Sequence, residues 1–269
     1  MYILYIIYYI IVMKIVFILF LLLLIFITIF MLNKYENYTQ RNAFDNIDAV
    51  IYINLDHRKD RKKQIEHELK RMGVPKNKII RLPAVYEEYN GHLGCSKSHN
   101  KVMNMIQNTN YNTVLVIEDD FIFTVDKETL HMKLNHFFDT FKDDWDACHL
   151  TASYKSTDYI DEHIHKCKSA MTSSAYIVNN KKKTFIEKLK ASFEDSIDKL
   201  TRNMEEVFKK EGKKKITQNG AALNQNWGDL QKESKWYIFM PYLGEQGGEA
   251  GGSSIMSNLD NERKRVKSD

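Results

Sequence analysis

The stretch from Val114 to Asp120 constrains the fold of this chain more than any other. It runs Val-Leu-Val-Ile-Glu-Asp-Asp, so that four apolar residues lead directly into three carboxylates. A short apolar run of this kind is typical of a strand that is buried on both faces of a parallel sheet. The sequence therefore predicts an α/β fold with a mostly parallel central sheet flanked by helices. Glu118, Asp119 and Asp120 would close a central strand, at the edge where open α/β sheets bind ligands.

Three adjacent carboxylates repel one another unless a cation or hydrogen-bond donors offset their charge. Mg²⁺ and Mn²⁺ prefer oxygen ligands of this type and leave coordination positions for substrate phosphates. The acidic run is therefore a candidate metal site. The alternative is a solvated acidic turn that binds no ligand.

The amino-terminal segment is almost wholly apolar, and Lys14 is the only charged residue among the first 32. The uninterrupted run from Ile15 to Leu32 has about 18 residues, close to the minimum that spans a bilayer. The run ends without the small-residue site at which a signal peptide is cleaved. We expect residues 1–33 to form an uncleaved signal anchor with one transmembrane helix.

Residues 34–47 are polar and lack apolar periodicity, which predicts a stem between the anchor and a domain over residues 48–256. Basic residues lie on both sides of the anchor, Lys14 before it and Arg41 after it, so the positive-inside rule does not decide its orientation. A type II arrangement with a luminal domain is the orientation we expect.

Bulk composition narrows the function classes. After the anchor, about 220 residues remain, which suits one domain with a sizeable core. The formal net charge of +4 is too small to indicate a nucleic-acid partner. Three cysteines are too few for a disulfide-stapled scaffold, although Cys148 and Cys167 can pair in an oxidising compartment if their Cα atoms approach.

Periodicity and turn residues predict the remaining elements in order. Residues 257–269 are charged and are expected to be a frayed tail. The other expected elements are strand 49–55, a helix to residue 72, strand 78–82, a helix entered through 91–94, helix 127–141, strands 146–151 and 169–178, helix 180–215, strand 236–239 and a flexible glycine-rich loop at 244–254.

Two segments carry further candidate site residues. Arg58 and Arg61 stand at a predicted helix start, where guanidinium groups and helix N–H groups both favour a diphosphate. The alternative is that they are solvated helix-end charges. Cys95 and His99, at the glycine-flanked start of another helix, are more often packing residues than a nucleophile and a ligand.

Four segments in this order resemble glycosyltransferase family 25, which includes lipooligosaccharide galactosyltransferases and procollagen galactosyltransferase domains. The similarity covers most of residues 49–255. The four segments are Ile53-Asn54-Leu55-Asp56-His57-Arg58-Lys59-Asp60-Arg61, Gly94-Cys95-Ser96-Lys97-Ser98-His99, Leu115-Val116-Ile117-Glu118-Asp119-Asp120, and Pro241-Tyr242 with Gln246 and Ser253-Ser254-Ile255.

The resemblance implies a GT-A-like Rossmann fold, a UDP-sugar donor, and Mn²⁺ or Mg²⁺ as cofactor. The implied reaction moves a hexose, galactose in the family, to a hydroxyl of a glycan or protein acceptor. Asp120 and Glu118 would hold the metal, and Asp229 would be the general base. Donor contacts would come from Asn54, Arg58, Arg61, Ser98, His99, Glu118 and Asp119.

Two other classes stay open from the sequence. A membrane-anchored protein can keep this fold and bind a sugar or nucleotide without catalysis. A glycoside hydrolase would also use two carboxylates across a sugar bond. It needs no diphosphate site, and the Arg58 and Arg61 loop therefore argues against it.

Overall fold

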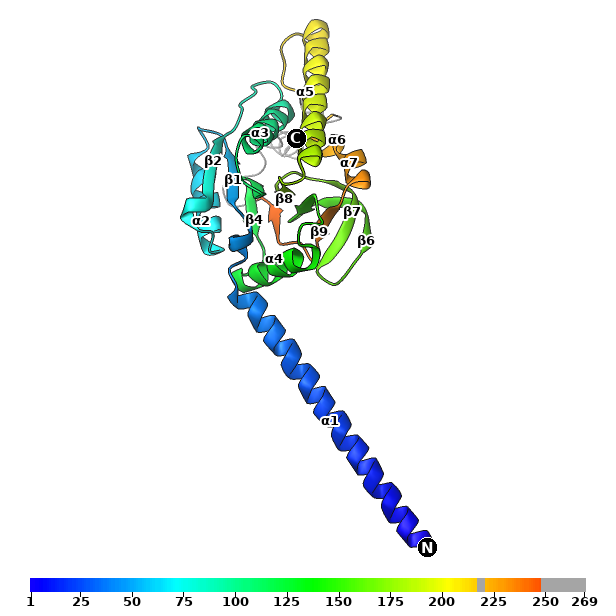
Figure 1. Ribbon diagram of the computed structural model, residues 1–269. Helices are drawn as coiled ribbons and strands as arrows, with labels where there is room; N and C mark the ends of the chain where they lie inside the picture. The colour runs from blue at the N-terminus through cyan, green and yellow to red at the C-terminus, as the bar shows by residue number, and fades with distance from the viewer. Residues whose placement is uncertain (217–220, 248–269) are drawn as a thin grey trace, which may run out of the picture.

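A mixed eight-stranded sheet organises the domain (Figure 1), in a computed structural model that describes residues 1–216 and 221–247. The expected tail and the segment Ser253-Ser254-Ile255 lie outside the described residues. The sheet order is β2-β1-β3-β8-β5-β9-β7-β6, and β4 and β10 form a separate pair. The strands are β1 (Ala49–Asn54), β2 (Ile79–Pro83), β3 (Thr113–Glu118), β4 (Phe121–Phe123), β5 (Ala147–His149), β6 (Ser153–Tyr159), β7 (Ile164–Met171), β8 (Ala175–Asn179), β9 (Trp236–Phe239) and β10 (Gly244–Gln246).

Strand directions follow from the pairings. β1 runs parallel to β2 and β3, and β5 runs parallel to β9, whereas β8 is antiparallel to both β3 and β5. β7 is antiparallel to β9 and β6. Among the eight described strands of this sheet, only β8 and β7 therefore oppose the common direction. The predicted α/β fold with a mostly parallel central sheet is confirmed.

Helices cover both faces of the sheet. Ile65, Leu69, Leu130 and Phe137, from α2 and α4, pack with η1 against one face. Side chains of α3, α5 and the short helices α6 and α7 pack against the other face. The helices are α1 (Tyr2–Gln40), η1 (Ala43–Asn46), α2 (Lys59–Arg71), η2 (Lys76–Lys78), α3 (Gly91–Gln107), α4 (Lys127–Phe141), α5 (Lys183–Glu211), α6 (Leu223–Asn226) and α7 (Gly228–Glu233).

β3 is buried on both faces, as its apolar sequence predicts. Leu115 and Ile117 point into one core, and Val114 and Val116 point into the other. Because successive side chains of a strand alternate between faces, a strand between two helix layers must be apolar throughout. The first polar residue of the run, Glu118, therefore falls where the strand leaves the core.

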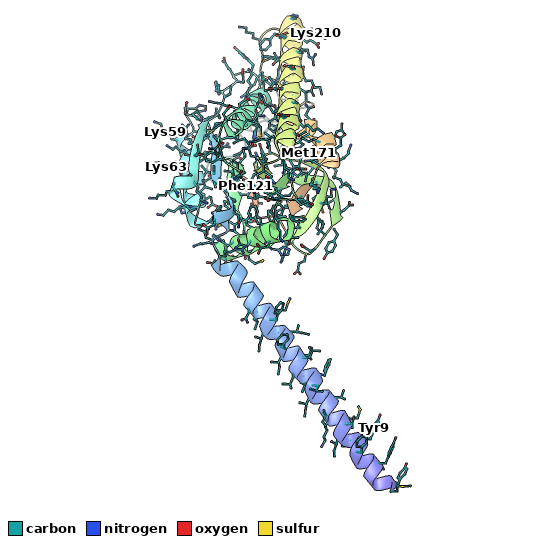
Figure 2. The ribbon with its side chains drawn as sticks, in the orientation of Figure 1. Tyr9, Lys59, Lys63, Phe121, Met171 and Lys210 are labelled. Carbon is teal, nitrogen blue, oxygen red and sulfur yellow. The ribbon has the colours of Figure 1, made fainter. Side chains whose placement is uncertain are left out.

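One amino-terminal helix is long and apolar enough to span a membrane. Within α1, the segment Tyr8–Asn33 has a mean hydropathy of 3.4 and is not buried against the rest of the protein. Figure 2 shows its side chains, Tyr9 among them, projecting freely from the helix. The helix leads away from the domain beside α4 (Figure 1).

The expected stem at residues 34–47 divides between two elements. α1 continues as a helix to Gln40, and the next residues pack onto the domain. Arg41 donates hydrogen bonds to Asn135 and pairs with Asp139 on α4, and Phe44 is fully buried. α1 is thus fastened to the domain directly, through residues that we expected to form a polar spacer.

The expected strand at 169–178 is interrupted and forms two strands, β7 and β8. β6, which precedes β7 as its hairpin partner, was not predicted, because its side chains are largely exposed and give no apolar signal. Of the flexible loop expected at 244–254, residues 244–246 form β10, and residues 248–254 lie outside the described part of the chain. Gly244 is required in β10, because a Cβ atom would lie within 2.3 Å of the Ile122 carbonyl oxygen.

Cys148 and Cys167 cannot form the disulfide that the sequence left open. Both are buried, but Cys148 belongs to the core on one face of the sheet and Cys167 to the core on the other. Both are free thiols. The sheet lies between the two thiols, and this packing excludes the disulfide, which the sequence alone could not decide.

Candidate functional site

A cleft of about 140 Å³ lies at the carboxyl ends of the parallel strands β1 and β3. This is the edge at which open α/β sheets bind ligands. All three residues of the acidic run line it, so the structure brings together what the sequence placed in succession. The lining residues are Ile53, Leu55, Arg61, Ala84, Val85, Tyr86, Glu87, Glu88, Gly91, Cys95, Ser98, His99, Glu118, Asp119, Asp120, Lys215 and Ile216.

The acidic run occupies a strand end and a tight turn. Glu118 is the last residue of β3, and Asp119 and Asp120 form the turn into β4. β10 and the residue that follows it, far from this turn in the sequence, bind it through hydrogen bonds. The Gly247 N–H donates to the Asp120 carbonyl oxygen at 2.9 Å, and Gln246 Nε2 donates to Asp120 Oδ2 at 3.3 Å.

Arg61 is the cation that faces the acidic run. It stands in the first turn of α2 with its side chain only 5% exposed, and its Nη1 lies 3.3 Å from both Asp119 Oδ1 and Asp120 Oδ2. Buried Asn54, the last residue of β1, donates from Nδ2 to Asp119 Oδ2 at 2.7 Å. Both Arg61 and Asn54 were predicted to contact the UDP-sugar donor, and the structure places both against the carboxylates of Asp119 and Asp120.

Burial and the neighbouring carboxylates raise the pKa of Asp119 and of Asp120, although Arg61 acts in the opposite direction. Burial and the charge of Glu118 raise the pKa of Asp120 to about 7. Burial also raises the pKa of Asp119, against hydrogen bonds from Asn54 and Arg61. Burial opposes ionisation of Glu118 as well, but hydrogen bonds from His99 and Ser173 outweigh it and hold the Glu118 pKa below its usual value.

His99 and Ser98, both predicted as donor contacts, are engaged within the protein. His99 is fully buried on α3, with Nδ1 2.8 Å from the Tyr176 hydroxyl and Nε2 3.3 Å from Glu118 Oε1. Ser98 Oγ accepts from the Val85 N–H at 2.8 Å and donates to the Gly94 carbonyl. Both residues line the cleft, and His99 also holds the Glu118 carboxylate.

Arg58 lies beside the cleft rather than in its lining. Its guanidinium pairs with Asp60 at 2.7 Å. Its hydrogen bond to Asp60 and the negative charges of Asp60, Asp119 and Asp120 raise the pKa of Arg58. Arg58 therefore lies within electrostatic reach of the acidic run.

Asp229 is the predicted site residue that the structure keeps apart from the others. It stands in the first turn of α7, with its side chain 89% exposed, and it does not line the cleft. It pairs with Lys232, one helical turn away, at 2.8 Å, and this hydrogen bond lowers its pKa. The geometry gives Asp229 no contact with the acidic run.

The acidic run fits the divalent cation that the family resemblance implies. Asp119 and Asp120 share the Arg61 guanidinium, and burial together with the charge of Glu118 raises the pKa of Asp120. A hard divalent ion prefers such oxygen ligands. Asp120 and Glu118 are the residues that would hold it.

Several cleft residues were not predicted. Glu87 and Glu88 belong to the loop between β2 and α3, and Lys215 arrives from beyond α5. No local pattern marks these residues, because their place in the cleft depends on how distant segments pack. Gln246, which is part of the fourth family-like segment, contacts Asp120.

Comparisons with known proteins show only distant structural similarity. No family model and no curated protein matches the sequence. A UDP-glucose pyrophosphorylase in complex with UDP-glucose has a TM-score of 0.44 and 8% identity, with 87% of each chain covered. A197 from STIV has a TM-score of 0.40 and 8% identity, over 76% of this chain and 87% of that one. A mannose-1-phosphate geranyltransferase from Thermus thermophilus has a TM-score of 0.40 and 10% identity, over 71% of this chain and 72% of that one.

Proposed function

We propose that this protein is a membrane-anchored glycosyltransferase that moves a hexose from a UDP-sugar to a hydroxyl of a glycan or protein acceptor. Galactose is the hexose that the resemblance to family 25 suggests. One observation carries the proposal: Glu118, Asp119 and Asp120 converge on a cleft at the carboxyl end of the central strand, opposite Arg61. A solvated acidic turn would be exposed, whereas Asp119 and Asp120 are buried.

The residues of the cleft would have different roles in binding a sugar diphosphate. Arg61 and Asn54 hold Asp119 in place, and Arg61 also orients Asp120. A divalent cation held by Asp120 and Glu118 would supply Lewis-acid stabilisation of the negative charge that develops on the departing UDP. His99 and Ser173 fix the Glu118 carboxylate through hydrogen bonds to Oε1.

The acceptor hydroxyl must lose its proton to a base within hydrogen-bond reach. Asp229 lies outside the cleft, which weighs against it in this role. Glu88, an exposed carboxylate in the cleft lining, is the base that we propose instead. Changing Glu88 to Gln should slow transfer to an acceptor about 10²- to 10⁴-fold, the usual contribution of a positioned base, while UDP binding persists.

A binding protein without catalysis is the second candidate, favoured by the exposed position of Asp229. Two measurements on the full-length protein in detergent separate the two functions. A thermal shift that requires both UDP and Mn²⁺ supports the proposed donor site. Release of UDP from a panel of UDP-sugars, with and without Mn²⁺, then tests turnover. Binding without UDP release across the panel, with acceptor sugars present, would favour the inactive protein.

We also propose a type II orientation, with α1 in the membrane and the domain in a lumen. The direct packing of Arg41 and Phe44 onto the domain would then hold the cleft at a fixed height above the bilayer.

A further inference from the structure

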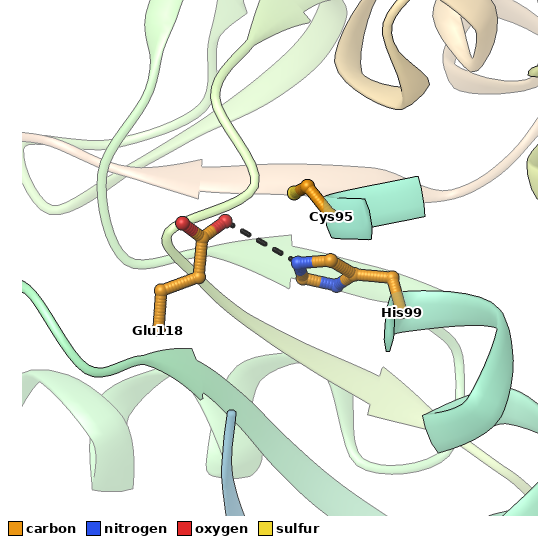
Figure 3. A group of neighbouring side chains, drawn as sticks. All are labelled: Cys95, His99 and Glu118. Carbon is orange, nitrogen blue, oxygen red and sulfur yellow. Dashed lines mark hydrogen bonds and ion pairs between the residues drawn. The ribbon is translucent and has the colours of Figure 1, made fainter. Parts of the chain in front are cut away.

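A second set of ligand atoms lies in the wall of the same cleft, apart from the aspartates of the acidic turn. Cys95 Sγ, the ring nitrogen of His99 and a carboxylate oxygen of Glu118 all lie within 4.8 Å of one another. Figure 3 shows the three side chains converging from α3 and the end of β3, with His99 bonded to Glu118. This set contains a thiol and an imidazole, which the hard-cation site lacks.

The spacing of these residues suits chelation. Cys95 and His99 are four residues apart on α3, and side chains at this spacing share one face of a helix. His99 Nε2 lies 3.3 Å from Glu118 Oε1. Neighbouring ligand atoms around a tetrahedral zinc ion lie about 3.3–3.6 Å apart, given bond lengths of about 2.0–2.3 Å. The nitrogen and oxygen already have this separation, and the sulfur lies within 4.8 Å of both.

Groups behind the ligands orient two of them, as in established metal sites. The Tyr176 hydroxyl contacts His99 Nδ1 at 2.8 Å and leaves Nε2 directed at Glu118. Ser173 Oγ donates to Glu118 Oε1 at 2.6 Å. Partners of this kind fix the ring tautomer and the carboxylate position, and their loss typically weakens metal binding about 10- to 100-fold.

We propose that Cys95, His99 and Glu118 form a binding site for a thiophilic divalent cation of the Zn²⁺ class. All three residues line the cleft, so an ion held by them would lie beside the space where a substrate would enter. On binding, the Cys95 thiol releases its proton to solvent and the thiolate bonds to the metal. A thiolate and an imidazole favour Zn²⁺ over Mg²⁺ and Mn²⁺, which prefer oxygen ligands.

The site has a consequence for the reaction, and this part rests on the proposed function. Glu118 belongs to both cation sites, so Zn²⁺ bound to Cys95 and His99 would withdraw it from the hard cation held with Asp120. Zn²⁺ should therefore inhibit the Mn²⁺-dependent release of UDP. In the Cys95→Ser variant, the Zn²⁺ concentration that halves the variant's own rate should rise at least about tenfold.

Cobalt reports the site independently of any activity. The full-length protein in detergent is stripped with a chelator and titrated with Co²⁺, whose bond to a thiolate produces a charge-transfer absorption in the near ultraviolet. We expect this absorption to saturate at one equivalent and to disappear when Zn²⁺ is added. Cys95→Ser should abolish it, and Cys167→Ala, which removes a buried thiol elsewhere, should retain it. Circular dichroism checks that each variant is folded, and His99→Asn replaces Cys95→Ser if the latter unfolds.

The outcomes separate this site from the proposed transferase. Asp120→Asn should lose Mn²⁺-dependent UDP binding yet keep the cobalt absorption, because Asp120 is not one of the three ligands. Absence of the absorption in the wild-type protein would overturn the site, as would its persistence in folded Cys95→Ser or His99→Asn. Neither result would touch the Mn²⁺-dependent binding of UDP. Conversely, an absorption without any UDP release would leave the site standing and remove only the inhibitory role.

Discussion

Asp120 and Asp229 are the same residue type in opposite settings. The Asp120 side chain is 6% exposed, faces Arg61 and follows a strand that is buried on both faces. The Asp229 side chain is 89% exposed, faces Lys232 and lies on a short surface helix. Burial and a neighbouring carboxylate raise the pKa of Asp120 to about 7, whereas the hydrogen bond from Lys232 lowers the pKa of Asp229.

The difference shows that the surroundings of a carboxylate, more than its place in a sequence motif, decide what it can do. When burial opposes the ionisation of a carboxylate, a nearby cation stabilises its ionised form most strongly. Asp229 is already satisfied by solvent and a surface lysine, and such exposed pairs contribute little. The buried acidic turn is therefore the region where chemistry is expected.

The largest expected effect is a difference in the rate of UDP release between the Asp120 and Asp229 variants. Asp120→Asn removes the charge that would hold the cation, so the Mn²⁺-dependent release of UDP should fall at least about 100-fold, as for the loss of one strong electrostatic contact. Asp229→Asn should retain the wild-type rate. Initial rates with UDP-sugar and acceptor measure both. Wild-type turnover in Asp120→Asn would refute its role, and a large loss in Asp229→Asn would restore the original assignment.

Replacing the cationic partners of the two aspartates, Arg61 and Lys232, should change the free energy of unfolding by different amounts. Arg61→Met leaves Asp119 and Asp120 buried without their guanidinium, and breaking a buried ion pair in this way costs about 3–5 kcal/mol. Lys232→Met should leave the urea midpoint unchanged, because its partner is exposed. Urea unfolding of the two variants measures the contrast.

Adding a divalent ion to the urea unfolding of Arg61→Met tests the cation site as well. If the acidic turn binds Mn²⁺, adding the ion should recover part of the stability that Arg61→Met loses, because a bound ligand stabilises the folded state by mass action. No recovery at millimolar Mn²⁺ would count against a cation site at Asp120.

A smaller loss is expected at Asn54, which positions Asp119. Its Nδ2 donates to Asp119 Oδ2 at 2.7 Å and to the Arg58 carbonyl, and its Oδ1 accepts from Arg81 at 2.9 Å. Asn54→Ala leaves buried partners unsatisfied and should cost about 1–3 kcal/mol. Asn226→Ala, which removes a partly exposed asparagine on α6, is the control and should cost less.

The sequence predicted the acidic turn and its strand because both depend on local pattern. Four apolar residues before three acids define β3 and its end without help from the rest of the chain. The loop that ends β1 could be predicted for the same reason. The helix start pointed to Arg61, and the resemblance added Asn54; the structure places both against Asp119, and their role in donor binding stays a prediction.

What the sequence could not predict depends on long-range packing. Gln246 reaches Asp120 across 126 residues, and no local pattern encodes such a contact. The β6–β7 hairpin carries polar, exposed side chains on β6, so it lacks the apolar alternation that reveals a half-buried strand. The family resemblance alone suggested Asp229 as a site residue, and only the position of α7 at the surface shows that it is solvated.

The smallest expected effect is the pH dependence of stability that a buried histidine causes. His149, on β5, is fully buried, and burial lowers its pKa to about 3. An unfolded chain takes up a proton at histidine near pH 6.5, so the unfolded state is favoured as the pH falls below that value. The stability that neutral His149 provides is complete above about pH 6.5 and is lost as the pH falls toward 3.

Urea unfolding between pH 7 and pH 4.5 measures this loss. The contribution of His149 should approach about 1.4 kcal/mol per pH unit within that range. His149→Gln should have a shallower pH dependence than the wild type, whatever its stability at pH 7. His67→Gln, at a side chain that is 75% exposed, is the control and should keep the wild-type slope. Equal slopes in His149→Gln and the wild type would mean that burial does not set the charge of this residue, and the contrast between Asp120 and Asp229 would then need another cause.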